Sequence, residues 1–461
     1  MREGDCPVNE KKPSIWQKEI TIPWRAVTEK LPAGTEEWLA LTAVGLFILA
    51  PAVMSVLAMA HRSIDYTVFV HPRLIRNYIY PFSAVLSALT MILSAARRKA
   101  AGERPRDFFR RNPVYLFFAL LLIWMLISQT VNGWGLYAFL GALTREETIF
   151  MQLGYFCLLF PGAALVRDER KKRSLLRLHM FVSYFLAAAA NILWHSQTES
   201  VIFNNWSPVF SSIYTSTNYY GYYLATVIPI AAVLLSAEKH WGWKLFSGLT
   251  LAVNGAALSM NSTMGAWVAC AATFIFLLIA RFIIERKPDW WILLGAVIVA
   301  VMLWLPDRII GTANVQVNTS QLASDVTAIA VQAENAGSAG SGRWRIWQGT
   351  VSLIGQKPLL GWGMEAIYAH DLTSITVSTR PHNEYLQYAL FYGIPAALLY
   401  FTGCFSVFLQ DLRLKVRLDA MTFACLGAAF SYLVSAFFGN TIYCTAPFLF
   451  LFLGMGLVRD P

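Results

Sequence analysis

The sequence predicts an all-α polytopic membrane protein with about twelve transmembrane helices and one long extracytoplasmic loop. Three observations lead to this fold class. Of the 461 residues, 56% are hydrophobic and only 14% are charged, and the mean hydropathy is +0.49, unlike an ordinary soluble domain. Apolar segments of about 20 residues, long enough to cross a bilayer, recur along the chain. Lysine and arginine concentrate in alternate connections between these segments.

The apolar segments divide the chain into four parts. Residues 1–36 are polar and lysine-rich without the layout of a signal peptide, so we expect a cytoplasmic N-terminal tail. Residues 37–305 contain nine predicted spans, near 39–60, 79–96, 113–131, 148–166, 174–194, 219–236, 242–258, 263–281 and 290–305. Residues 306–381 form the long loop. Residues 382–461 contain three more spans, near 383–408, 420–437 and 441–458.

The basic connections predict the orientation. They are 97–111, 167–177, 281–287 and 413–417, whereas the connection from His195 to Asn218 has no lysine or arginine. Twelve spans place all four basic connections and both termini in the cytoplasm. Arg62, Arg73 and Arg76 disagree, because they would be external. The net charge of +10 is therefore largely a topology signal, and we expect no nucleic-acid partner.

The long loop has two parts of different composition. Gly311–Gly342 is rich in Ala, Ser, Thr, Gln, Asn and Gly, and we expect it to be mobile. Arg343–Ile354 spaces Trp347, Val351 and Ile354 as on one face of a helix, which predicts a short amphipathic helix on the bilayer surface. After that helix, the sequence Gly-Trp-Gly at 361–363 predicts a tight turn.

One histidine is the leading candidate for chemistry. His382 follows Pro381 and is expected in the first turn of the tenth span, at the external interface, where an imidazole can exchange protons near neutral pH. Arg380, Arg343 and Arg345 lie on the same predicted side, and arginine binds phosphate oxygens in a bidentate manner. The alternatives are that the histidine only anchors a helix end and that each arginine only contacts lipid headgroups.

Two other groups are candidates for substrate binding. Arg145, in the charged run Arg145–Glu147, begins the fourth span, although such a run also serves as a solvated helix cap. Tyr214 and Asn218 belong to the aromatic and polar run Tyr214–Tyr223 at the outer end of the sixth span. Its hydroxyl groups and its amide suit a sugar, whereas interfacial tyrosines are also typical of any aromatic belt. No metal-ligand spacing is present among the cysteines, so no metal site is predicted.

Four segments form a recognisable set of motifs. The first is His382–Asn383 followed by nine residues and then Gly393. The others are the loop segment Ser341–Gly363, Asn218–Gly221 and Ser262–Trp267. Together these segments resemble the O-antigen ligase and O-antigen polymerase (Wzy-C-like) superfamily of bacterial polysaccharide assembly. The resemblance runs from about residue 204 to 393, and the predicted topology extends it to the whole chain.

The resemblance implies a GT-C-like glycosyltransferase without metal or other cofactor. Its donor would be a glycan on a polyprenyl diphosphate, and its acceptor a hydroxyl group on a glycan, lipid or protein, at the outer face of the bacterial inner membrane. His382 would take the acceptor proton as general base, the hydroxyl would attack the anomeric carbon with inversion, and Arg343 would neutralise the departing diphosphate. The residues expected to bind substrate are Arg345, Arg380, Asn383, Tyr385, Asn218, Tyr214 and Arg145.

The chain departs from the ligase pattern at three places. No arginine precedes Asn218, Met264 stands where the ligases have an arginine, and Ala396 replaces a usual glycine, threonine or tyrosine. The missing arginines favour a polymerase slightly over a ligase. A transporter or flippase of a lipid-linked saccharide is the main alternative from another class, and a non-catalytic membrane component is a third. Few ionisable residues within the spans and no internal repeat weaken the case for transport.

Overall fold

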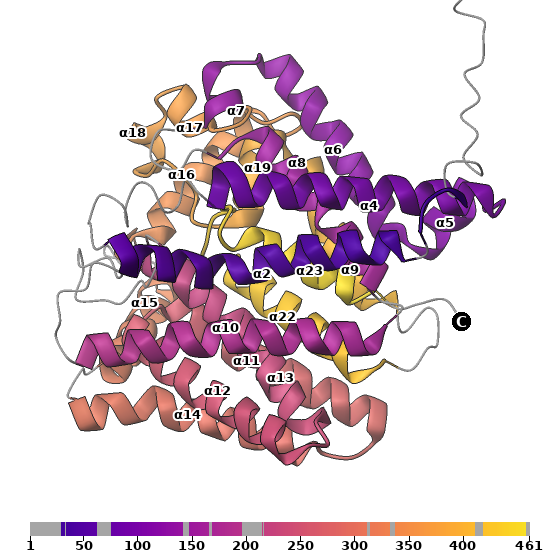
Figure 1. The fold of residues 1–461 in the computed structure, drawn as a ribbon. Helices are drawn as coiled ribbons and strands as arrows, with labels where there is room; N and C mark the ends of the chain where they lie inside the picture. The colour runs from indigo at the N-terminus through magenta and orange to yellow at the C-terminus, as the bar shows by residue number, and fades with distance from the viewer. Residues whose placement is uncertain are drawn as a thin grey trace, which may run out of the picture.

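The computed structural model describes residues 29–32, 34–61, 75–141, 147–165, 168–195, 214, 216–310, 314–331, 337–410 and 418–457. In these residues the secondary structure is helical, without strands, which agrees with the predicted all-α class. The long helices lie side by side in a bundle, and the short helices of the long loop gather at one end of it (Figure 1).

Ten of the predicted spans coincide with single helices. These are α2 (Thr35–His61), α4 (Tyr80–Ala100), α6 (Pro113–Asn132), α10 (Glu169–His195), α11 (Thr217–Ala237), α12 (Trp241–Asn261), α13 (Met264–Glu285), α14 (Trp290–Ile310), α22 (Ala420–Ser435) and α23 (Ala446–Met455). Three short helices lie between them, namely η3 (Ile75–Ile79), α5 (Pro105–Arg111) and α7 (Leu136–Leu140).

The other two predicted spans are broken helices. Residues 148–166 form α8 (Ile149–Cys157) and α9 (Leu159–Ala164), and residues 383–408 form α19 (Glu384–Tyr392) and α20 (Ile394–Phe408). By length and composition, five helical segments within the described residues can cross a membrane: Thr35–Val53, Asn77–Ala100, Pro113–Asn132, Thr217–Ala237 and Met264–Glu285. The chain is therefore a membrane protein, and the count of twelve spans stays a prediction.

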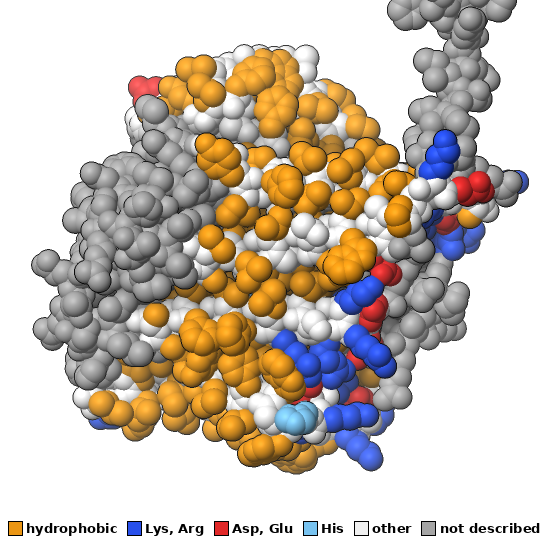
Figure 2. Space-filling view, in the orientation of Figure 1, with side chains coloured by type: hydrophobic (Ala, Val, Ile, Leu, Met, Phe, Trp, Pro, Cys, Tyr) orange, Lys and Arg blue, Asp and Glu red, His pale blue; other side chains and the backbone are white. Residues whose placement is uncertain are grey.

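The surface of the bundle supports a membrane location. Exposed apolar side chains cover much of the face of the molecule shown in Figure 2. The exposed apolar residues of the outer helices include Leu120 and Ile123 of α6, Ile279 of α13 and Val297 of α14. So much contiguous apolar surface is unusual in a soluble monomer and suits contact with lipid. Inside this surface, every residue of α11 from Tyr220 to Leu235 is buried, and α11 packs against α12, α13 and α22.

Lysine and arginine side chains gather at one end of the bundle (Figure 2). Ion pairs join the helices there: Arg97 of α4 to Glu36 of α2 at 3.1 Å, and Arg177 of α10 to Glu238 after α11 at 2.7 Å. Lys172 of α10 is fully buried and donates to the Thr422 hydroxyl of α22 at 2.7 Å. These residues belong to helix ends that the sequence predicts to be cytoplasmic. Lys171 of α10 also pairs with Glu37 of α2, so the described parts of the basic connections 97–111 and 167–177 share one end, which we name the basic end. The basic connection 413–417 lies outside the described residues.

The long loop is more ordered than its composition suggested. Residues 314–330, expected to be mobile, form the helix α15 (Asn314–Ala330). Asp325 in this helix accepts hydrogen bonds from Gln321 Nε2 at 2.7 Å and from the Gly340 amide at 2.8 Å, which ties α15 to the next turn of the loop. The sequence carries a helical signal here, because Leu322, Val326 and Ile329 are spaced at i, i+4 and i+7 and the alanines and glutamines favour helix formation. The prediction failed because it was based on the polar composition alone.

The predicted amphipathic helix is present as α16 (Arg343–Gln356), but its buried face differs from the prediction. Thr350, Leu353 and Ile354 are buried, whereas Val351 is exposed. This face packs on α19 and on α18 (Thr373–Thr376), and α17 (Ala366–Ala369) lies between them in the chain. Helix α16 thus packs on protein through a face that shares Ile354, but not Val351, with the predicted apolar face.

Three backbone hydrogen bonds explain why the span 383–408 is broken. The amides of Trp362 and Gly363 donate to the carbonyls of Leu390 and Phe391 at 2.9 and 2.8 Å, and the Ile394 amide donates to the Pro358 carbonyl at 2.8 Å. Gly393 has a φ of 88°, a conformation that ends α19 and that glycine adopts without steric cost. The loop therefore docks on the break between α19 and α20.

Replacement of Gly393 by alanine should destabilise the protein. A Cβ at this position would overlap the Leu359 carbonyl oxygen, and an L-residue is disfavoured at this φ. We expect a loss of about 2–5 kcal/mol, the sum of overpacking and left-handed strain, visible as a lower melting temperature of the purified protein. Gly355→Ala in α16, where a Cβ would meet no atom within 4 Å, is the control. Equal melting temperatures for the two variants would contradict this account of the break.

Candidate functional site

The connection between α22 and α23, residues 436–445, is the centre of the candidate site. Its backbone accepts from the Glu384 amide at the Ala436 carbonyl (2.8 Å), from the Tyr222 hydroxyl at the Phe438 carbonyl (2.6 Å) and from Arg380 Nη1 at the Thr441 carbonyl (3.0 Å). We name residues 436–445 the α22–α23 connection. It holds together α11, α19 and the end of the long loop.

His382 lies against this connection. Its backbone amide donates to Oδ1 of Asn440 at 2.8 Å, and its ring Nδ1 lies 3.3 Å from Nδ2 of the same asparagine. The prediction placed His382 in the first helical turn, but the residue precedes the helix and has a φ of 50°. Non-glycine residues adopt this conformation uncommonly, and such residues are concentrated at active sites and at turns.

The spacing between the histidine and the glycine of the predicted motif corresponds to one helix. Asn383 is the N-cap of α19, and its side chain accepts from the Leu386 amide at 3.1 Å. Gly393 is the C-cap, so the nine residues between them are the whole of α19. Tyr385, on the first turn, donates its hydroxyl to the Leu433 carbonyl at 2.8 Å. Asn383 and Tyr385 thus both position α19 in this structure.

Arg380 is fully buried beside the site. Its guanidinium pairs with Glu365, which is 1% exposed, and also donates to the Thr441 carbonyl. A charge in such a dry position needs this partner, because removal from water costs several kcal/mol. Arg380 therefore fastens the end of the long loop to the α22–α23 connection, and sequence reasoning did not single out Glu365.

Arg343 and Arg345 begin α16, the helix of the loop that packs on α19. Arg343 is half-buried, donates to the Gly340 carbonyl at 3.3 Å, and lies close enough to Tyr222 for its charge to act on that hydroxyl. Arg345 is exposed. Within the described part of the chain, neither arginine pairs with a carboxylate, so both can receive an anionic ligand.

Helix α11 brings the tyrosine segment to the same connection. Asn218 lies half-buried in its first turn, one turn before Tyr222. Tyr214 is buried, and its ring lies 5.1 Å from that of Tyr223. The Tyr214 hydroxyl has no hydrogen-bond partner among the described residues. Arg145 lies outside the described residues.

The segment Ser262–Trp267 also reaches the α22–α23 connection. A Cβ at Gly265 would lie 2.8 Å from the Phe438 side chain, so α13 approaches the connection closely. Asn261, just before the segment, donates from Nδ2 to the Thr217 carbonyl at 2.8 Å. The segments around 218, 262–267 and 382–393, separated in sequence, are therefore brought together by one connection.

Two buried carboxylates belong to residues that hydrogen-bond with the α22–α23 connection, Glu147 and Glu384. Glu147 accepts from the Tyr155 hydroxyl at 2.7 Å and from the Tyr443 amide at 2.6 Å, and it interacts electrostatically with both Arg380 and Glu384. Burial raises the pKa of Glu147 to about 7, against the opposing effects of Arg380 and of these hydrogen bonds. Glu384 accepts from two tyrosine hydroxyls, those of Tyr400 at 2.8 Å and Tyr432 at 2.9 Å.

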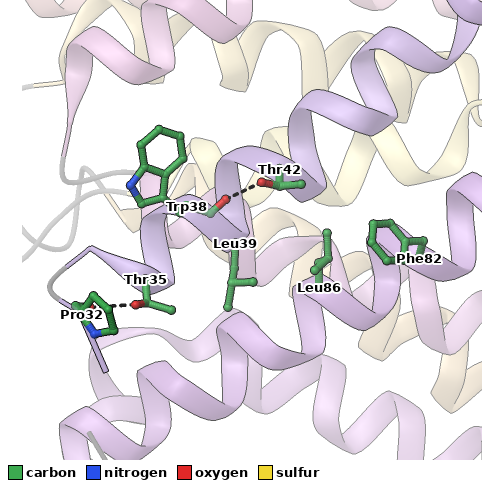
Figure 3. Close-up of a pocket in the computed structure, with 7 residues that line it drawn as sticks. All are labelled: Pro32, Thr35, Trp38, Leu39, Thr42, Phe82 and Leu86. Atoms are coloured by element: carbon green, nitrogen blue, oxygen red, sulfur yellow. Dashed lines mark hydrogen bonds between the residues drawn. The ribbon is translucent and has the colours of Figure 1, made fainter. Parts of the chain in front are cut away.

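A separate pocket lies between α2 and α4 (Figure 3). Pro32, Thr35, Trp38, Leu39 and Thr42 line it on one side, and Phe82 and Leu86 on the other. It contains no charged side chain and none of the predicted site residues. Within the described residues, no group of three or more His, Cys, Asp or Glu side chains is placed to hold a metal ion.

The comparison with protein families gives one match. Residues 248–401 match the family model described as O-antigen ligase, which is about a third of the 461 residues. The match contains α16, His382 and Gly393, and it confirms the resemblance that the sequence motifs predicted. It supports membrane glycan transfer as the general activity. A comparison with curated proteins found no match.

Arg380→Ala should destabilise the protein strongly, because it leaves Glu365 buried without its partner. We expect a loss of roughly 3–5 kcal/mol, measured by thermal unfolding in detergent. Arg345→Ala removes an exposed arginine and should change stability by less than about 0.5 kcal/mol. If Arg380→Ala melts at the same temperature as Arg345→Ala, the structural role of Arg380 is wrong.

The raised pKa of Glu147 predicts a dependence of stability on pH. Between pH 4.5 and about 7 the folded protein binds more protons at this carboxyl than the unfolded chain does. Its contribution to the free energy of unfolding is therefore complete below pH 4.5 and is lost as the pH rises through about 7, by up to about 3 kcal/mol. Melting temperatures measured from pH 4.5 to 8 should fall less steeply with pH in Glu147→Gln than in the wild type. An equal dependence on pH in the two proteins would contradict a raised pKa for Glu147.

Proposed function

We propose that this chain, whose residues 248–401 belong to the O-antigen ligase family, transfers a glycan from a polyprenyl-diphosphate carrier to a hydroxyl acceptor at the outer face of the bacterial cytoplasmic membrane. One observation carries the proposal. The family-like segments around 218, 262–267 and 382–393 converge on the α22–α23 connection, with His382 held against it.

The charge distribution supports the proposed orientation. The basic end would face the cytoplasm, as the positive-inside rule requires. His382, α16 and the short loop helices belong to the connections predicted on the other side and would face the periplasm or exterior. A lipid-linked donor enters such a site sideways from the outer leaflet while its sugar stays in water. Both chain termini would then be cytoplasmic.

Arg343 and Arg345 are the proposed diphosphate ligands. Neither forms an ion pair with a carboxylate among the described residues, and both lie in the first turn of α16, which packs on α19. Their fixed positive charge would stabilise the diphosphate as it leaves, without a metal ion. Arg380 would contribute its positive charge from a buried position, since its guanidinium is already paired with Glu365.

The sugar and acceptor would lie between α11 and His382. Tyr214 offers a buried hydroxyl without a partner among the described residues, and Asn218 offers an amide on the first turn of α11. Asn383, Tyr385 and Arg145 complete the proposed binding set. His382 would hydrogen-bond with the reacting groups, either as the base that the family resemblance implies or as a donor to the departing diphosphate.

The acceptor class separates a ligase from a polymerase. A ligase joins a finished polymer to a lipid or protein, and a polymerase joins repeat units to one another. Met264 replaces the arginine of the ligases, and no arginine precedes Asn218. We therefore favour the polymerase, with a donor diphosphate bound by loop arginines.

His382→Asn should abolish transfer, because it removes the imidazole while asparagine still tolerates the positive φ. The expected loss is on the order of 10²–10⁴-fold. Lipid-linked glycan should accumulate in cells, which gel electrophoresis and mass spectrometry would measure. Single accumulated repeat units would indicate a polymerase, and long chains would indicate a ligase. Arg343→Ala should show the same accumulation with a smaller loss.

Two matched controls make this experiment decisive. His370→Asn removes an exposed histidine of the same loop, and Arg286→Ala removes an exposed arginine after α13. Both should transfer as the wild type does. If His382→Asn is inserted normally and polymer still forms at the wild-type rate, the proposed active site is wrong and transport of a lipid-linked saccharide becomes the leading function.

A further inference from the structure

We propose that Asn440 is a positioning residue that holds His382 as the tautomer protonated at Nε2, so that His382 serves the transfer as a hydrogen-bond donor and not as a base. The inference rests on the proposed function for its catalytic consequence. The tautomer itself follows from the hydrogen-bonding groups of the two residues. Asn440 lies on the α22–α23 connection, outside the matched residues 248–401.

The orientation of the Asn440 amide is fixed by the backbone of His382. A backbone N–H can only donate, and its contact at 2.8 Å must therefore be with the carbonyl oxygen Oδ1. The amide nitrogen Nδ2 is then the atom that lies 3.3 Å from the ring Nδ1. An exchange of the two amide atoms would place a donor against the backbone N–H.

This orientation determines where the ring proton lies. The side-chain Nδ2 of asparagine is only a donor, so Nδ1 of His382 must accept. A neutral imidazole with an accepting Nδ1 carries its proton on Nε2. Any group that meets Nε2 must then accept a hydrogen bond. To take up a second proton, the ring would have to use Nδ1 and place two donors against one another.

The surrounding contacts prevent Asn440 from turning away. Phe438, two residues before it, accepts from the Tyr222 hydroxyl, and Thr441, directly after it, accepts from Arg380. Arg380 also fixes the chain two residues before His382 through its pair with Glu365. Asn440 is itself 3% exposed. Both partners of the contact are thus held by interactions other than the contact itself.

A donor at Nε2 suits the departing diphosphate. In the transfer, the acceptor oxygen bonds to the anomeric carbon, and the bond from that carbon to the diphosphate oxygen breaks. The electron pair of the broken bond passes to the diphosphate, and the hydroxyl proton passes to water. The negative charge that develops on the leaving group is then stabilised by the His382 N–H together with Arg343.

Asn440→Asp tests the assignment, because it reverses the tautomer with almost no change of shape. One carboxylate oxygen still accepts from the His382 backbone amide, and the other now requires an N–H at Nδ1. Neutral His382 would then have an unprotonated Nε2, the arrangement needed by a base. The analogous exchange between aspartate and asparagine in a serine protease triad is known to select the wrong tautomer.

We expect Asn440→Asp to lose roughly 10- to 100-fold in transfer rate at alkaline pH, where its Nε2 lacks a proton. The rate should recover towards acidic pH, because the imidazolium again carries an Nε2–H. The wild type should show no such recovery. The nearby charged groups are the same in both proteins, so a difference between the pH profiles reports on residue 440. These groups are Arg380, Glu365, Glu384, Arg343 and Glu147, whose carboxyl accepts from the Tyr443 amide of the same connection.

Nitrogen-15 spectra of histidine-labelled protein in lipid provide a readout independent of activity. The signal of His382, assigned among the seven histidines by its loss in His382→Asn, should show an accepting Nδ1 and a protonated Nε2 in the wild type. The two should exchange roles in Asn440→Asp. A wild-type spectrum with a protonated Nδ1 would overturn the inference, whatever the activity.

The remaining outcomes separate this inference from the proposed function. If Asn440→Asp is as active as the wild type or more active at alkaline pH while His382→Asn is inactive, His382 is a base and only the inference fails. If His382→Asn remains active, the proposed active site fails, and the spectra still decide the tautomer. Gln356→Glu, which adds the same charge at an exposed position at the end of α16, controls for charge alone and should leave transfer unchanged.

Discussion

The buried guanidinium of Arg380 is the interaction on which the arrangement of the site depends. It joins Glu365 of the long loop to the Thr441 carbonyl of the α22–α23 connection. His382 follows two residues later and Asn440 directly precedes Thr441, so the same interaction fixes both sides of the contact between them. A buried ion pair adds little net stability by comparison with apolar packing. Its value here is that it permits one relative position of the loop and the connection.

The rest of the bundle isolates this polar centre from lipid. Helix α11 is buried throughout its middle and separates the outer helices, while the carboxylates of Glu147 and Glu384 are satisfied by tyrosine hydroxyls and backbone amides. Polar groups without partners are costly in a membrane interior, where no water replaces them. The tyrosines that solvate these buried acids are Tyr155, Tyr400 and Tyr432, which lie outside the run Tyr214–Tyr223. This arrangement leaves the loop arginines Arg343 and Arg345 as the charges available to a ligand.

Sequence patterns predicted the local structure well where a single residue determines the start or the end of a helix. The nine residues between Asn383 and Gly393 were identified as a spacing, and they are the length of α19, because asparagine caps its start and glycine its end. The break after Tyr392 was missed, since the apolar run continues through it and only the docking of Pro358–Gly363 reveals it. Helix α15 was missed because the prediction was based on the polar composition of the segment and not on the helical spacing of Leu322, Val326 and Ile329.

The sequence by itself determined that the protein is an α-helical membrane protein, where its apolar segments lie and which connections are basic. These properties depend on hydropathy and charge, which each segment carries independently of the others. Only the tertiary structure decided which polar side chains meet. It paired Arg380 with Glu365 and placed Asn440 against His382. The sequence patterns had not singled out Asn440, which lies between two apolar segments. Such contacts depend on distances between segments far apart in the chain, and no local pattern encodes them.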